Sequence, residues 1–419
     1  MIHFNFLKSS IVVLFLANAG NFLNYLIQIV IGRYLSLEEY GIHNSVLSLG
    51  VILTSGTMML MSLGAKYAVP MRYDRNAAKN LMIRWSKIII IWSGLGMIVL
   101  LLLSDVISQL LQLDSNSVVF AFLFGMVFVH LLSFYEGFLN GLGHHAMSNL
   151  LGLGLSFVRL LSTLGILISG MGYALYTVGA LSFSTALTAL GGGWLLYLLI
   201  RKLPNKETTE SKPLNQKKEL NFLLPSFLTW TGIAILSHID IVIIKHHFDA
   251  TSTGHFTQAA IIARIGFFAT SALTMVLLPE ISNTESKQPK HLVRTALLIS
   301  GGIAGIFSLI CWISPDFVVQ IFFSSQASDG SYLPMLSVNY VLVAMLSLIF
   351  TINLGKGDYL LQIIYFIAII FFSIVLFVIN IDNIQTFIYM MTLFLILLLL
   401  MAITRTIFKS SIVTKISDE

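Results

Sequence analysis

Three charged side chains interrupt long apolar stretches of this 419-residue sequence: Arg159, Asp240 and Arg264. A charge at the centre of a bilayer costs at least about 2.5–3.5 kcal/mol on insertion scales, so each needs a partner or a water-filled cavity. Arginine stays protonated and binds phosphate oxygens in a bidentate manner. We therefore predict that Arg159 and Arg264 line a cavity that accepts an anionic group such as a diphosphate.

Asp240 and Arg264 are predicted at matching depth on neighbouring helices, where they form an ion pair. Two interpretations of this pair remain open. It is either a static salt bridge, or Asp240 releases Arg264 on protonation or cation binding and so couples a gate to an ion gradient. Glu136, by contrast, is expected at the membrane interface.

Two cations near helix ends extend the predicted cationic path to either side of the membrane: Lys66 and Arg33. The alternative is that both side chains simply reach out to the interface, as long basic side chains do.

A stripe of polar side chains follows the first apolar stretch at spacings of three or four residues, namely Asn18, Asn21, Tyr25 and Gln28. This spacing places them on one helix face. Ser237 belongs to a similar stripe with Asp240, and Ser48, Ser55, Ser62 and Lys66 form another. Small polar residues also join helices to one another in membranes. For the first stripe we favour a face that lines a polar cavity, together with Ser237.

The composition defines the elements that must position these residues. Hydrophobic residues make up 57% of the chain and charged residues only 10%, against about 25% charged in a soluble domain. A soluble enzyme, a disordered chain and a secreted disulfide scaffold are excluded. Because Cys311 is the single cysteine, no intramolecular disulfide and no cysteine-built metal site is possible. We expect no metal and no cofactor.

Apolar stretches long enough to cross a bilayer, about 20 residues each, occur twelve times. The sequence therefore predicts an all-α integral membrane protein with transmembrane helices at about 10–32, 42–69, 88–104, 118–139, 147–168, 174–200, 222–246, 256–280, 292–314, 333–353, 359–380 and 384–407.

The distribution of basic residues predicts the orientation. All but four of the 24 Lys and Arg residues lie at one set of helix ends; the exceptions are Arg33, Lys245, Arg159 and Arg264. Since basic residues concentrate on the cytoplasmic side, both termini and the polar segment 201–221 are expected in the cytoplasm, with the chain in the cytoplasmic (inner) membrane.

The sequence also contains an internal repeat around that polar segment. The junction at residues 32–41 corresponds to the one at 245–254, and Asn140 to Asn353, both at an offset of 213; Pro70 and Pro279 are 209 apart. We predict a six-helix bundle over 1–200, a cytoplasmic linker over 201–221 and a second bundle over 222–419. Two such bundles in one orientation imply a pseudo-twofold axis along the membrane normal, with the substrate site between the repeats.

These landmarks carry a family resemblance. The junction Gly-Arg-Tyr-Leu-Ser-Leu-Glu-Glu-Tyr-Gly at 32–41, and in the second half Asp240, Gly254 and the segment 277–282, resemble the polysaccharide (O-antigen-type) flippases. That family shares a superfamily with the multidrug and toxin extrusion transporters. The resemblance implies a non-enzymatic flippase that moves polyprenyl-diphosphate-linked oligosaccharide outward for surface polysaccharide synthesis. It implies a lipid-linked oligosaccharide, membrane lipids, a proton or sodium ion and the glycan polymerase and chain-length machinery as partners; no nucleic acid is expected.

Two alternatives remain. An ion-coupled multidrug exporter has the same fold, but cationic drugs favour buried carboxylates, whereas the charges away from the ends of the spans here are two arginines and one aspartate. A membrane glycan polymerase or ligase belongs to a different class and usually has a large external loop with catalytic arginines. The longest external stretch here, about 315–332, contains no Arg or Lys.

Overall fold

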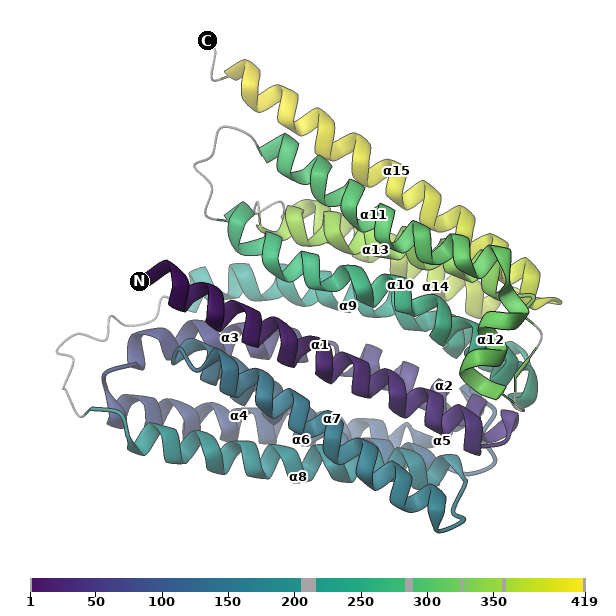
Figure 1. Cartoon of the computed structure of the whole chain (residues 1–419), viewed down its shortest axis with the longest axis horizontal. Helices are drawn as coiled ribbons and strands as arrows, with labels where there is room; N and C mark the ends of the chain where they lie inside the picture. Colours follow the sequence, from purple (N-terminus) through teal and green to yellow (C-terminus); the bar gives the residue numbers. More distant parts are fainter. Residues whose placement is uncertain are drawn as a thin grey trace. The chain divides into compact units, whose positions relative to one another are not determined.

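The computed structural model describes residues 2–204, 216–282, 289–324, 327–328, 330–355 and 359–416. Within this part of the chain the secondary structure is helical and contains no β-strand, as the composition predicts. The chain divides into two compact units, Met1–Glu219 and Leu220–Glu419, which are described separately (Figure 1).

Unit 1 has five long unbroken helices, one broken helix and two short segments. α1 and α7 pack side by side, and α6 packs against both α3 and α8. The elements are α1 Ile2–Tyr34, α2 Leu37–Leu53, α3 Thr57–Ala68, the 3₁₀ turn η1 Val69–Met71, α4 Arg75–Leu102, α5 Ser104–Leu110, α6 Ser117–Gly141, α7 His145–Ile168 and α8 Ala174–Arg201.

Unit 2 repeats this order with one difference, because its second helix is continuous. α13 packs against α10, α11 and α15 and is the most extensively buried of the membrane-length helices. The elements are α9 Gln216–His247, α10 Ala250–Ser282, α11 Pro289–Ile313, α12 Pro315–Phe323, α13 Leu333–Gly355, α14 Tyr359–Val378 and α15 Ile384–Ile416.

Nine helices among the described residues are long and apolar enough to cross a membrane, or ten if α2 and α3 count as one span. The chain is therefore a multi-pass membrane protein. α1 and α10 are each 33 residues long, but some of their residues do not belong to the part that was searched for spans. The total of twelve spans therefore stays a prediction. The predicted domain limits also stay predictions, because residues 205–215 of the expected linker lie outside the described residues.

The second span differs from the prediction of one helix over 42–69. It is broken between Leu53 and Thr57, and its halves are bent by 42°. Thr54 donates its hydroxyl proton to the carbonyl of Gly50 at 2.7 Å, and Gly56 follows, two features that bend helices. The predicted single stripe from Ser48 to Lys66 is therefore wrong, because the break interrupts its face.

The repeat is visible in how the second helix of each unit begins. Ser36 Oγ accepts a hydrogen bond from the Glu39 amide at 3.3 Å at the start of α2. In unit 2, Asp249 Oδ1 accepts from the Ser252 amide at 2.9 Å, and Ser252 Oγ donates to Asp249 Oδ2 at 2.7 Å. These hydrogen bonds hold the pKa of Asp249 below its ordinary value. Ser36 and Asp249 are 213 residues apart, so the same capping position is used in both halves.

Glycines allow α3 and α6 to approach closely. A Cβ atom on Gly64 would lie 2.6 Å from the Phe134 carbonyl oxygen, and one on Gly137 or Gly141 would meet the α3 backbone. Gly137 and Gly141 have the i, i+4 spacing of small residues at membrane helix interfaces. This contact fixes α6, which carries Glu136.

Candidate functional site

Unit 2 positions three polar side chains on three helices that pack together. Asp240 is on α9, Arg264 on α10 and Tyr340 on α13. Their exposed fractions are 4%, 5% and 2%. Because α10 packs closely on α13, a tyrosine from a distant part of the sequence reaches the predicted pair.

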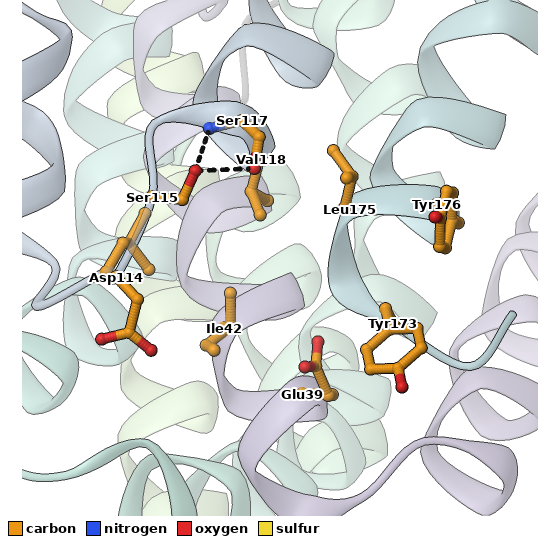
Figure 2. A pocket seen from close by; sticks show the side chains of 10 residues that line it. Glu39, Ile42, Asp114, Ser115, Ser117, Val118, Tyr173, Leu175 and Tyr176 are labelled. Carbon is orange, nitrogen blue, oxygen red and sulfur yellow. Dashed lines mark hydrogen bonds between the residues drawn. The ribbon is translucent and has the colours of Figure 1, made fainter.

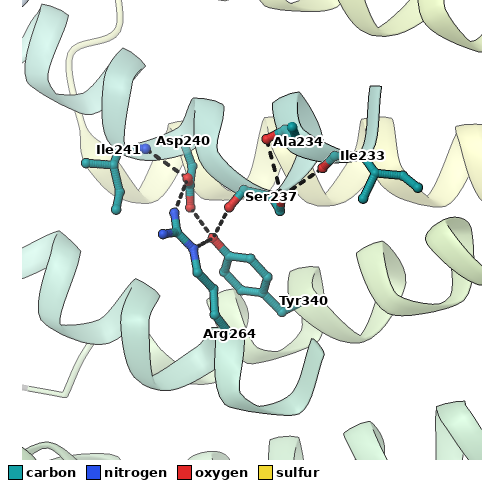
Figure 3. Close-up of polar contacts among 7 residues, drawn as sticks. All are labelled: Ile233, Ala234, Ser237, Asp240, Ile241, Arg264 and Tyr340. Atoms are coloured by element: carbon teal, nitrogen blue, oxygen red, sulfur yellow. Dashed lines mark hydrogen bonds and ion pairs between the residues drawn. The ribbon is translucent and has the colours of Figure 1, made fainter. Parts of the chain in front are cut away.

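The three side chains form a closed hydrogen-bonded ring (Figure 3). Arg264 Nη2 donates to Asp240 Oδ1 at 2.8 Å, forming an ion pair. Arg264 Nε donates to Tyr340 Oη at 2.6 Å, and Tyr340 Oη donates to Asp240 Oδ2 at 2.6 Å. The backbone amide of Ile241 also donates to Asp240 Oδ1 at 2.9 Å.

This arrangement confirms the predicted ion pair and shows its environment. Both carboxylate oxygens of Asp240 accept protein hydrogen bonds, and the guanidinium carbon of Arg264 lies 5.5 Å from the centre of the Tyr340 ring. In this state Arg264 is engaged by protein groups, so a role in binding cargo requires the ring to open. That role, and the predicted coupling role of Asp240, stay predictions.

Unit 1 holds its arginine differently. Arg159 on α7 is half-buried, and its Nη2 donates to Thr185 Oγ1 on α8 at 2.9 Å. The proton of that hydroxyl goes to the carbonyl of Leu181, also on α8, at 2.8 Å. Arg159 Nε is buried and has no hydrogen-bond partner among the described residues. The guanidinium therefore retains capacity for an acceptor that none of the described residues supplies.

Glu136 is the acidic group whose charge acts on Arg159. Its side chain is half-buried on α6, where Oε1 would lie 3.4 Å from a Cβ atom on Gly152 of α7. No ion pair joins the two residues in the described structure, so the interaction acts over a longer distance. The expected position of Glu136 at the membrane interface stays a prediction.

The predicted polar stripe on α1 is partly accessible. Asn18 and Asn21 are exposed, and Tyr25 and Gln28 are half-buried. Gly20 lies against Leu153 and Ser156 of α7. Ser237, in contrast, is 3% exposed and donates to the Ile233 carbonyl within its own helix at 2.7 Å. Whether these residues line a transport cavity stays a prediction.

Arg33 and Lys66 are exposed at the ends of α1 and α3. Their predicted contact with cargo stays a prediction. Lys245, a basic residue outside the predicted cytoplasmic set, is 2% exposed near the end of α9.

Sequence reasoning missed Tyr340 and Thr185. Both are uncharged, and Tyr340 is 76 residues from Arg264. A hydroxyl at a buried helix position is a weak signal, because serine, threonine and tyrosine occur throughout these apolar segments. Only the packing of the helices identifies the two that contact an arginine.

Comparison with known protein families gives a match. The family model described as "Polysaccharide biosynthesis protein" matches residues 5–285. No curated protein sequence matches the chain.

Solved transporters share the fold at low sequence identity. An inward-facing multidrug resistance MATE family transporter of the MOP superfamily has a TM-score of 0.69 and 15% identity, covering 91% of this chain and 94% of its own. The outward-facing conformation of such a transporter gives 0.68 and 16%, covering 96% and 95%. A MOP superfamily transporter from Pyrococcus furiosus, whose binding pocket is described as having reverse polarity, gives 0.63 and 16%, covering 94% of each chain.

Family and fold are those of membrane transporters. Since the family model covers more than half of the sequence, the chain belongs to the polysaccharide biosynthesis protein family and has the fold of the MATE transporters.

Proposed function

We propose that this protein is a flippase that moves polyprenyl-diphosphate-linked oligosaccharide from the cytoplasmic to the external leaflet for surface polysaccharide synthesis. The bundles alternate access to a central cavity, and the protein does not alter the covalent structure of its cargo. The observation that carries this proposal is the state of Arg159, a half-buried cation whose Nε has no acceptor among the described residues and whose contact through Nη2 is a neutral hydroxyl.

The charge of Arg159 favours an anionic cargo. A diphosphate offers several oxygens to a planar guanidinium, which binds them in a bidentate manner. Among the described residues, Glu136 makes no ion pair with Arg159, so a diphosphate can bind Arg159 without breaking one. A cationic drug would instead be repelled by Arg159.

The ring in unit 2 acts as the gate in this proposal. Release of Arg264 from Asp240, on protonation of Asp240 or on binding of a cation, supplies a second cation for the headgroup. This links the movement of the cargo to an ion gradient. Arg33 and Lys66 guide the headgroup at the two membrane surfaces, and the protein works beside the polymerase that consumes its product.

Reconstitution tests the proposal. The purified protein is placed in liposomes with a fluorescent polyprenyl-diphosphate-linked disaccharide, and arrival in the opposite leaflet is followed by quenching. We expect transport of chemically unchanged lipid by the wild type. In Arg159→Ala the rate should fall by about tenfold or more. Arg159→Lys keeps the charge without bidentate geometry and should retain part of the rate.

Arg84→Ala is the matched control, because Arg84 is an exposed arginine on α4. It should transport at the rate of the wild type. An unaffected rate in Arg159→Ala contradicts the binding site. Export of cationic dyes without movement of the lipid would identify a multidrug exporter, and a lengthened or cleaved glycan would identify a polymerase or ligase.

A further inference from the structure

Unit 1 contains a cavity at the end of the bundle opposite to Lys66, at the side predicted to be external. Its volume is about 340 Å³, within the range of small-molecule sites. The start of α2, the segment between α5 and α6, and the start of α8 surround it. The lining includes Glu39, Asp114, Ser115, Tyr173 and Tyr176.

Two hydrogen bonds hold the α2 and α8 walls of this cavity together. Glu39 Oε2 accepts from the backbone amide of Ala174 at 2.6 Å, at the start of α8. One helical turn further in, His43 Nδ1 and Thr177 Oγ1 are 2.8 Å apart, with both side chains fully buried. Since these walls are fixed before any ligand arrives, little ordering is needed on binding.

The lining combines three kinds of surface. Figure 2 shows Asp114 and Ser115 on one side and Tyr173 and Tyr176 on the other. The two tyrosine rings meet edge to face, with their centres 6.2 Å apart, and both are exposed at 56% and 42%. Apolar side chains of Ile42, Val118 and others complete the lining.

This combination fits a sugar ring. The C–H face of a pyranose packs against an aromatic ring, and its hydroxyl groups donate to carboxylate oxygens in charge-assisted hydrogen bonds. A bare cation would make no use of the aromatic and apolar surfaces. No Lys or Arg lines the cavity, so the two carboxylates repel a uronic acid or a phosphate.

We propose that this cavity is a saccharide-binding subsite that takes neutral or amino sugars of the cargo, separate from the arginine that binds its diphosphate. This inference rests on the proposed function. Thr185, the partner of Arg159, lies twelve residues after Tyr173 on α8, or about 18 Å along the helix at 1.5 Å per residue. An oligosaccharide attached to a diphosphate spans such a separation, so one cargo molecule contacts both groups.

Saturation-transfer NMR on the whole protein in lipid nanodiscs tests the subsite. The probes are three free disaccharides: cellobiose (neutral), chitobiose with free amines, and a glucuronic-acid-containing disaccharide. We expect millimolar binding of the first two and none of the third. Tyr176→Ala and Asp114→Asn should each weaken binding about tenfold. Tyr389→Ala, which removes a tyrosine 53% exposed near the start of α15, should leave it unchanged.

Several results would overturn the subsite. They are the absence of a signal from both cellobiose and chitobiose, equal binding of the acidic disaccharide, and unchanged binding in both cavity variants. Asp114→Asn keeps the shape of the side chain, so this variant should fold like the wild type. If the tyrosines serve only as interfacial anchors, no saccharide signal arises in the wild type.

The transport assay separates this inference from the proposed function. Disaccharide binding without movement of the lipid-linked substrate leaves the subsite in place and removes the flippase assignment. Transport of the lipid-linked substrate without disaccharide binding supports the flippase assignment and removes the subsite.

Discussion

Arg264 in unit 2 and Arg159 in unit 1 both lie far from the ends of their helices, but they differ in their partners. Arg264 has a carboxylate at ion-pair distance and a tyrosine hydroxyl at 2.6 Å. Arg159 contacts a threonine hydroxyl, and its buried Nε has no partner in the part of the chain that the structure describes. The residues at the repeat offset from the unit 2 ring are all apolar: Ile27, Val51 and Val127.

The reverse also holds. At the same offset, the counterparts of Glu136, Arg159 and Thr185 in unit 2 are Ile349, Phe372 and Leu398. The two halves share helix order and capping positions but not their polar groups. The two units therefore have a similar order of helices but different arrangements of buried charge. One arrangement is satisfied internally, and the other leaves capacity for an acceptor.

The largest effect should come from Asp240→Ala. It leaves Arg264 buried without its carboxylate, and breaking a buried pair in this way costs about 3–5 kcal/mol of unfolding free energy. Unfolding in detergent and the amount of protein in the membrane measure it.

Replacing both members of that pair tests the reason for the loss. Asp240→Leu with Arg264→Leu removes the uncompensated charge, and should recover most of the stability. A single variant as stable as the wild type would show that the ring does not stabilise unit 2.

Tyr340→Phe should have the next largest effect. It keeps the ring over Arg264 but removes the hydroxyl that joins Arg264 to Asp240, and hydrogen bonds to charged groups contribute about 1.5–3 kcal/mol. The measurement is again the unfolding free energy, with exposed Tyr389→Phe as control. Equal losses in the two variants would contradict the ring.

The caps provide a comparison away from the arginines. Asp249→Ala and Ser36→Ala should each lower the unfolding free energy by about 1 kcal/mol at neutral pH. The two differ in their pH dependence. Because the pKa of Asp249 is lowered in the folded protein, its contribution is present above the unfolded pKa of about 4 and is lost as the pH falls through the folded value.

Unfolding measured against pH distinguishes the two caps. The difference between wild type and Asp249→Ala should shrink in acid, while the difference for Ser36→Ala stays constant. A pH-independent difference at Asp249 would mean that its charge does not contribute.

Arg159→Ala should change the unfolding free energy by about 1 kcal/mol, since it removes one side-chain hydrogen bond between membrane helices and leaves no unpaired charge behind. Its effect should appear in transport instead. A stability loss as large as that of Asp240→Ala would mean that Arg159 is a structural residue like Arg264.

Thr185→Val should have the smallest effect, about 0.6 kcal/mol, the average for a side-chain hydrogen bond between membrane helices. The variant removes the acceptor of Arg159 Nη2 but keeps the charge, whereas Arg159→Ala removes both. Transport should persist, because the charge of Arg159 remains. Loss of transport in Thr185→Val with full activity in Arg159→Ala would reverse the assigned roles.

The sequence alone predicted the order of the helices, and it identified three charges inside the bundles, Arg159, Asp240 and Arg264, but not the buried Lys245. The bilayer requires about 20 apolar residues per span, so hydropathy predicted the long helices closely, as at 174–200 for α8 Ala174–Arg201. The repeat offset of 213 by itself puts Ser36 and Asp249 in equivalent positions. Asp240 and Arg264 were paired by depth alone.

Only the tertiary structure decided which buried charge is satisfied. The contacts of Arg264 depend on how α13 packs, and those of Arg159 on how α8 packs. The ring in unit 2 joins residues that are far apart in the sequence, since Tyr340 and Asp240 are separated by 100 positions. The bend after Leu53 likewise depends on local hydrogen bonding that hydropathy does not record. Apolar helices pack by shape, and a pattern of hydrophobicity carries little information about which faces meet.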